Sequence, residues 1–351
     1  MRKPADEAEQ ETQARPTTKD LARVAGVSRA TVDRVLNGRD GVQAKTIERV
    51  NAAIKKLGFV RNLSAANLAR SKSYRFLFVL PRHGDQFLAE ILRRIDEAVS
   101  VFSTDAIWLD VHHINENDPH AIADYLSTLS PGNIDGVAIM APETPQVRDA
   151  ILRLQERGVK ALPFISGQAL SDADWVGIDN RSAGRTAAIL LGRFVRAPAG
   201  QVLVVAESML SRDSLERRLG FDEVLNTRFP GLTALPSLET YSSGDRARRI
   251  ITTAFERNDD IVAVYVLSSE ARVPLSIVKQ ARVNPLVCIA HERTPSTELA
   301  LRDGSLDALI TQNAGHLVRS AVRKLRALSD NRGTLESQEK IRIEIVLSSN
   351  L

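Results

Sequence analysis

The run GVSRATVDRVLNGRDGV at residues 26–42 places small, hydroxyl-bearing and basic side chains close together at helical spacing. Ser28 and Thr31 carry hydroxyls that can donate hydrogen bonds to phosphate oxygens. Arg29 and Arg34 are long enough to reach the acceptors on the edge of a guanine base. The chemistry that these residue types predict is contact with the phosphates and bases of a nucleic acid.

An acid, Asp33, stands in the middle of this basic run. A carboxylate facing a phosphate is repelled, so its presence needs an explanation. One is an ion pair with Arg29 four residues earlier, which would fix the direction of the arginine. A second is acceptance of a hydrogen bond from a cytosine amino group, and a third is a merely solvated side chain beside the groove.

Three short helices are expected to position these side chains. The first opens at Thr17, with Asp20 at capping-box spacing, and ends near Gly26. Ser28 caps the second, and the third covers residues 45–58 with one apolar face. A tight joint between the first two helices is typical of a helix-turn-helix, whose second helix enters the major groove.

Charge is distributed unevenly along the chain. Residues 17–73 contain twelve basic and four acidic side chains, a net charge of +8, whereas the whole protein carries only +4. A compact basic segment joined to a slightly acidic remainder is typical of a nucleic-acid-binding module attached to another domain. Residues 1–16 lack periodicity and aromatic side chains, so we expect a disordered leader there.

Residues 61–73 connect the basic module to the rest of the chain. The segment is too short and too rich in small residues to hold a helix by itself. It is therefore either a flexible linker or a hinge helix that folds on DNA, with Leu68 as an apolar wedge in the minor groove.

From residue 74 onward, apolar runs alternate with amphipathic segments, a βα pattern. Strands that are apolar on both faces predict parallel sheets covered by helices on both faces. About 280 residues exceed what one open sheet usually holds, so we expect two α/β lobes. The predicted strands are 75–81, 106–112, 135–141, 160–166, 175–179, 201–207, 261–267, 285–290 and 306–312.

Composition excludes several classes of protein. No apolar stretch approaches the roughly 18 to 20 residues of a membrane span, and the polar start does not resemble a signal peptide. The one cysteine, Cys288, lies in an apolar run and is expected to be a buried thiol. These features predict a soluble, globular protein of a reducing cytoplasm.

The segments TTKDLARVAGVSRATVDRVLNG and TIERVNAAIKKLGF, together with Asn62 and the pair Leu68-Ala69, closely resemble the lactose-repressor (LacI/GalR) family of bacterial transcription regulators. A looser match continues through IDGVAIM, VGIDNRSAGRTAA, ERRLGFDEVL and GSLDALITQN. The resemblance implies a small all-α helix-turn-helix head on a two-lobed body like that of periplasmic sugar-binding proteins. It further implies that the lobes close on a carbohydrate or polyol effector, and that a homodimer, or a tetramer, binds a palindromic operator in double-stranded DNA.

The resemblance also divides the chain and places the DNA contacts. It implies a helix-turn-helix at residues 17–60 and a body at 74–351. We expect the first lobe at 74–193 and 312–330, and the second at 199–310 and 333–351. With Thr31 and Asp33 added from the residue types alone, the expected DNA contacts are Thr17, Ser28, Arg29, Ala30, Thr31, Asp33, Arg34, Asn37, Thr46, Asn62 and Leu68.

For the effector, Arg217 occupies the position three before Gly220 at which the family holds an arginine against ligand hydroxyls. Its forked donors suit neighbouring sugar oxygens. The alternative is a surface arginine on a helix. Asp179 ends a predicted strand, where its carboxylate could accept from a ligand hydroxyl, cap the following helix, or do both.

The body departs from the family pattern at two strand ends. The chain reads SSEARVP where the family commonly has Asn-Asp, and His291-Glu292 where a strand-end Asp is usual. We expect the effector site at the same place, lined also by His291 and Glu292, with a different set of donors. His83 and Asp85, after the first strand, are further candidates for its lining.

Enzymatic interpretations find little support. The first strand is followed by LPRHGDQF, which is not a glycine-rich loop for a dinucleotide. Neither Ser166 nor Ser268 has a recognisable base partner, and the histidines near 112–120 lack a metal-site spacing. We therefore expect no cofactor, no metal and no membrane partner, and a regulator that acts as a repressor and is located at the bacterial nucleoid. A cytoplasmic α/β enzyme with an accessory DNA-binding head is the competing hypothesis.

Overall fold

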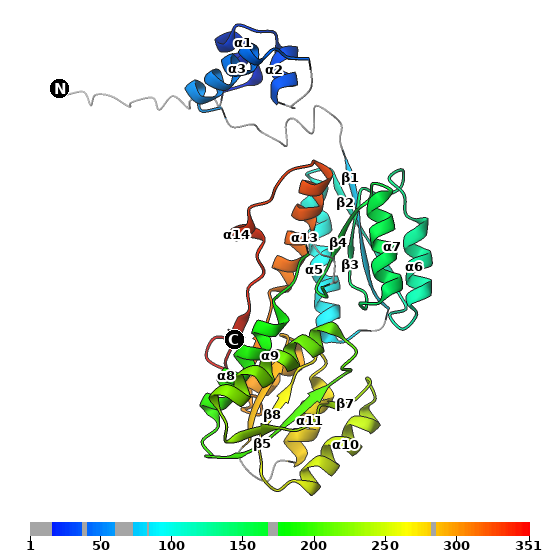
Figure 1. Ribbon diagram of the computed structural model, residues 1–351, viewed down its shortest axis with the longest axis vertical. Helices are drawn as coiled ribbons and strands as arrows, with labels where there is room; N and C mark the ends of the chain where they lie inside the picture. The colour runs from blue at the N-terminus through cyan, green and yellow to red at the C-terminus, as the bar shows by residue number, and fades with distance from the viewer. Residues whose placement is uncertain (1–15, 37–40, 60–72, 83, 168–174, 282–285) are drawn as a thin grey trace, which may run out of the picture. The chain divides into compact units, whose positions relative to one another are not determined.

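The computed structural model describes residues 16–36, 41–59, 73–82, 84–167, 175–281 and 286–351. The chain divides into two compact units, residues 1–72 and 73–351 (Figure 1). Each unit is built around its own buried apolar residues.

The first unit contains a three-helix cluster. Its described helices are α1 (Thr18–Ala25), α2 (Arg29–Leu36) and α3 (Ala44–Leu57). Apolar side chains spaced by three or four residues bring one face of each helix into a common core. The buried members are Leu21, Ala25, Val32, Val50 and Ala53.

A side chain of α3 holds the turn between α1 and α2 by hydrogen bonds. Gly26 adopts a left-handed backbone with φ of 61°, which a glycine tolerates best. Arg49 of α3 donates from Nη2 to the carbonyl oxygens of Ala25 at 2.6 Å and Gly26 at 2.9 Å. A Cβ at position 26 would lie only 2.7 Å from the same nitrogen. The helix-turn-helix geometry therefore depends on one arginine and one glycine.

The second unit begins with a four-stranded parallel sheet in the order β2-β1-β3-β4. Alternate side chains of β1 pack on opposite faces: Phe76 and Phe78 with α5 and α13, and Leu77 and Val79 with α6 and α7. The elements are β1 (Tyr74–Pro81), α5 (Gln86–Ser103), β2 (Ile107–Ile114), α6 (Pro119–Thr128), β3 (Gly136–Ile139), α7 (Pro145–Glu156), β4 (Lys160–Pro163) and α13 (Ala314–Ser329).

A second sheet has the order β11-β10-β9-β8-β5-β6, with β7 also beside β5. Helices α8 and α9 cover one face, while α10, α11 and α12 cover the other. The elements are α8 (Asn180–Phe194), β5 (Gly200–Ala206), α9 (Arg212–Arg228), β6 (Leu232–Ala234), β7 (Leu238–Glu239), α10 (Gly244–Arg257), β8 (Ile261–Val266), α11 (Arg272–Ala281), β9 (Val287–His291), α12 (Pro295–Arg302), β10 (Ala308–Thr311), α14 (Glu336–Glu339) and β11 (Glu344–Val346).

The two lobes are as expected in architecture but differ in three details. Residues 175–179 form an isolated bridge, Phe164 with Val176, in place of a strand. Strand β11 runs antiparallel to β10, although the sheet is otherwise parallel. Helix α8, predicted to lie in the first lobe, packs on α9 and touches β9 and β10, so the first lobe ends before residue 180.

Two glycines explain why α8 joins the second sheet. A Cβ at Gly184 of α8 would lie 1.9 Å from the carbonyl oxygen of Arg217, and one at Gly220 of α9 would lie 1.9 Å from that of Arg181. The two helix backbones therefore approach more closely than side chains would allow. Helix α13, in contrast, packs on the first sheet, as the resemblance implied.

None of the helices in the described ranges is both long and apolar enough to cross a membrane. Cys288 is buried in the second sheet, as expected for a thiol that acts as a small apolar side chain.

Candidate functional site

Helix α2 presents the predicted DNA-contacting residues on an open surface. Val32 is fully buried, whereas Arg29, Ala30, Asp33 and Arg34 are exposed. The helix therefore turns its apolar side to the three-helix core and its polar side outward.

The hydroxyls of Ser28 and Thr31, predicted from the sequence to contact phosphate, lie at the N-terminus of α2. Ser28 Oγ accepts from the backbone N–H of Thr31 at 3.1 Å, and the two side-chain oxygens are 2.8 Å apart. Both hydroxyls lie at the start of the helix, where phosphate is favoured by the helix dipole.

Of the remaining predicted DNA contacts, the structure describes Thr17 and Thr46. Thr17 forms the expected capping box with Asp20, and its hydrogen bonds lower the pKa of that carboxyl. Thr46 is half-buried near the start of α3. Asn37, Asn62 and Leu68 lie outside the described residues. The proposed pairing of Asp33 with Arg29 stays a prediction.

In the second unit, Arg217 is almost completely enclosed. Its exposed fraction is 4%. Nε donates to Asn180 Oδ1 at 2.8 Å, Nη1 to the carbonyl of Leu267 at 2.9 Å, and Nη2 to Glu292 Oε1 at 2.9 Å. The alternative of a surface arginine is therefore wrong, and Arg217 is the centre of a buried polar network.

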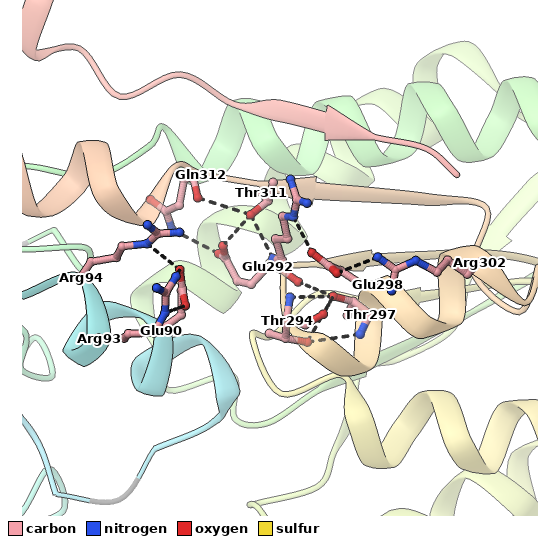
Figure 2. A network of polar contacts seen from close by, with 11 residues as sticks. Glu90, Arg93, Arg94, Glu292, Thr294, Thr297, Glu298, Arg302, Thr311 and Gln312 are labelled. Atoms are coloured by element: carbon pink, nitrogen blue, oxygen red, sulfur yellow. Dashed lines mark hydrogen bonds and ion pairs between the residues drawn. The ribbon is translucent and has the colours of Figure 1, made fainter. Parts of the chain in front are cut away.

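Glu292 is the anionic partner and is 1% exposed. It follows β9 with a left-handed φ of 64°, a strained conformation for a side chain of this size. Gln312 Nε2 donates to its Oε1 at 3.1 Å, and Thr311 Oγ1 lies 3.4 Å from its Oε2 (Figure 2). Burial raises the pKa of Glu292, and Arg217 opposes that rise.

The network lies at the carboxyl ends of neighbouring parallel strands. Leu267 follows β8, Glu292 follows β9 and Gln312 follows β10. In open α/β sheets this edge is where ligands bind. Asn180 and Asp213, from the N-terminal turns of α8 and α9, approach the same edge and are joined by a 3.3 Å hydrogen bond.

Both lobes contribute to this region. Arg212 Nη1 of the second lobe pairs with Glu143 Oε2 of the first at 2.7 Å. The backbone N–H of Ser296 donates to Gln86 Oε1 at 3.2 Å. Asp85, next to Gln86, caps α5 and adds to the pKa rise of Glu292 by charge repulsion, although burial is the larger cause.

The remaining effector candidates are not brought together. His291 is fully buried, its Nε2 lies 2.8 Å from the hydroxyl of Tyr265, and burial lowers its pKa well below the ordinary value. Asp179 caps α8, accepting from Ser182 N at 2.9 Å, and lines a separate groove of about 1010 Å³. The residues that line this groove do not include Arg217 or Glu292. His83 lies outside the described residues.

Sequence reasoning missed three members of the network. Asp213 lies four residues before Arg217, hence on the same face of α9, and accepts from Ser166 Oγ at 3.2 Å. Asn180 directly follows Asp179, and Gln312 ends a predicted strand. The sequence could place each of the three on a helix face or at a strand end. It could not show which side chains they would hydrogen-bond to in the folded protein.

No group of three or more potential metal-ligating side chains occurs among the described residues. His112 stacks on Tyr125 with ring centroids 3.6 Å apart, and His113 Nδ1 lies 3.0 Å from the carbonyl oxygen of Pro81.

Comparison with known proteins identifies both parts of the chain. Residues 17–62 match the family described as bacterial regulatory proteins, lacI family, and residues 76–333 match the periplasmic binding protein domain. The maltose regulon regulatory protein MalI of Escherichia coli is 30% identical over 251 residues, which are 71% of this chain and 70% of MalI. The regulator RegA of Clostridium saccharobutylicum is 35% identical over 136 residues, 39% of either chain.

Solved structures agree on the fold. GanP, a glucose-galactose binding protein from Geobacillus stearothermophilus, has a TM-score of 0.69 at 15% identity and covers 80% of this chain and 99% of its own. A LacI transcriptional regulator from Bacteroides fragilis has a TM-score of 0.67 at 18% identity, covering 80% and 98%. The chain belongs to the lacI family of bacterial regulatory proteins, which are DNA-binding transcriptional regulators and not enzymes.

Proposed function

We propose that the protein represses genes of carbohydrate uptake or catabolism, and that a small sugar-like effector controls its operator binding. The observation that carries this proposal is the Arg217–Glu292 network at the strand ends of the second lobe, within reach of the first lobe. MalI is named for the maltose regulon, and GanP for glucose and galactose. Carbohydrates are therefore the effector class to test first.

The exposed face of α2 is proposed to read the operator. Arg29 and Arg34 would reach base edges, while Ser28 and Thr31 would hold phosphates. A homodimer acting in the bacterial cytoplasm would place two such helices on the half-sites of a palindrome. Asn37, Asn62 and Leu68 would add contacts implied by the family resemblance.

Coupling between effector and DNA would run through the relative position of the lobes. A change in the angle between the lobes would break and re-form the inter-lobe contacts Arg212–Glu143 and Ser296–Gln86. Allosteric coupling of this kind typically amounts to about 1 to 3 kcal/mol, or a 5- to 150-fold change in DNA affinity.

The test begins by selecting operator fragments from genomic DNA with the full-length protein. Binding of a selected duplex is then titrated against salt and against a carbohydrate panel. Each neutralised phosphate should contribute about −0.9 to the slope of log K against log salt. A flat salt response would exclude the DNA-binding role, and a panel without any effect on DNA affinity would exclude control by carbohydrates.

A further inference from the structure

We propose that the effector of this site carries a protonated primary amine: an amino sugar or aminopolyol in preference to a sugar acid or a sugar phosphate. The inference rests on the proposed function, because it specifies the chemical class of the effector at the Arg217–Glu292 network. It follows from which hydrogen-bonding groups remain available after the contacts within the protein are assigned.

Each side-chain nitrogen at the centre of the network donates one hydrogen bond to a protein acceptor. Each nitrogen of the Arg217 guanidinium has a partner: Asn180, Leu267 or Glu292. The amide nitrogen of Asn180 donates to Asp213, and that of Gln312 donates to Glu292. The positive charge of Arg217 is matched by the carboxylate of Glu292, so an anionic ligand would meet an arginine that is already paired.

An acceptor, in contrast, is left over. Gln312 is 4% exposed, and its amide is oriented so that Nε2 donates to Glu292 Oε1. The other amide atom is therefore Oε1, which is buried and has no hydrogen-bond partner among the described residues. Figure 2 shows the Gln312 side chain beside Glu292. A buried acceptor of this kind is available to a hydrogen-bond donor of a bound ligand.

Carboxylates from both lobes also influence this region electrostatically. Asp85 precedes α5 in the first lobe, and the Gln86–Ser296 hydrogen bond joins that end of α5 to the first turn of α12, the helix after Glu292. Glu270 follows β8 in the second lobe. Burial raises the pKa of Glu270, and repulsion from Asp85 adds to the rise. The neighbouring Arg272 opposes the rise, because its guanidinium lies 3.8 Å from Glu270 and its backbone N–H donates to Glu270 Oε1 at 2.9 Å.

An ammonium group fits these surroundings because it supplies three donors and no acceptor. Its positive charge would offset the repulsion that Asp85 exerts on Glu270 and Glu292. A phosphate or carboxylate would add to that repulsion, and Arg217, the buried cation of the network, is already paired with Glu292.

The experiment uses calorimetry and thermal unfolding of the full-length chain. The probes are glucosamine, galactosamine and mannosamine, each beside its parent sugar, its N-acetyl derivative and its 6-phosphate. We expect at least one amine to bind about tenfold or more tightly than its N-acetyl counterpart, the loss typical of one charge-assisted hydrogen bond. Equal or tighter binding of a neutral or anionic analogue, or no binding by any amine, would overturn the inference.

The outcomes separate this inference from the proposed function. A neutral sugar that binds without an amine and releases the operator would overturn the inference while supporting carbohydrate control. Failure of every probe to bind and to alter DNA affinity would count against both.

A variant tests the residues responsible. Asp85→Asn combined with Glu270→Gln keeps size, and asparagine is an equally good helix cap. The preference for the amine over its N-acetyl derivative should fall about tenfold. The control, Asp149→Asn, removes an exposed acid on α7 that pairs with Arg153, and the preference should stay unchanged. A double variant that unfolds normally and keeps the full preference would overturn the inference.

Discussion

The two candidate sites of this protein, the exposed face of α2 and the Arg217–Glu292 network, differ in how their polar side chains form hydrogen bonds. On α2 the polar groups are exposed, and the hydrogen bonds of Ser28 are made within its own helical turn. Around Arg217 they are buried, and each bond joins segments far apart in the chain: Arg217 and Glu292 are separated by 75 residues. A surface that reads DNA can be assembled locally, whereas a buried network exists only once the second lobe has folded.

The largest expected effect follows from this difference. Arg217→Ala would leave the carboxylate of Glu292 buried without its cation, which typically costs about 3 to 5 kcal/mol. We expect a clear fall in the unfolding midpoint of the full-length protein, measured in urea. The control is Arg228→Ala, an exposed arginine on the same helix, which should change stability by less than about 0.5 kcal/mol. Equal effects of the two variants would show that the network does not stabilise the body.

The second prediction concerns the close packing that brings α8 to the network. Gly184→Ala places a methyl group where the carbonyl oxygen of Arg217 would lie 1.9 Å away, so the helices must separate. Overpacking of this kind typically costs about 1 to 3 kcal/mol. Gly244→Ala is the matched control, because no atom lies within 4 Å of its added Cβ. Thermal unfolding of both variants should separate them, and similar midpoints would contradict the packing argument.

The contacts that these two variants disrupt could not be predicted from the sequence, whereas the local helix caps could. The caps at Thr17 and Ser28 were predictable because donor and acceptor are three residues apart. The position of Arg217 was predictable from the family resemblance, but its partners were not, since Asn180 is 37 residues away. The pattern of α8 shows that one face is apolar without showing which sheet it covers, and this is why its lobe was wrongly assigned.

A smaller effect is expected at the start of α2. Ser28→Ala removes the side-chain acceptor for the N–H of Thr31, a loss that typically costs about 1 kcal/mol. Hydrogen exchange of the full-length protein should show weaker protection in the first turn of α2. Ser28→Asp should restore that protection and still bind DNA more weakly, because the carboxylate faces phosphate. Normal DNA affinity of the aspartate variant would show that this position does not face the backbone of the duplex.

The smallest effect is expected for Asp33→Ser. Asp33 is exposed on α2 beside Arg34 and four residues after Arg29, where an ion pair typically contributes only about 0.2 to 0.5 kcal/mol. Its carboxylate repels every phosphate alike, whereas orientation of Arg29 or acceptance from a cytosine helps only the correct sequence. Asp33→Ser should therefore strengthen binding to a scrambled duplex more than to the operator, in paired titrations at one salt concentration. A ratio of the two constants that stays the same or rises would leave Asp33 as a solvated side chain without a role in selectivity.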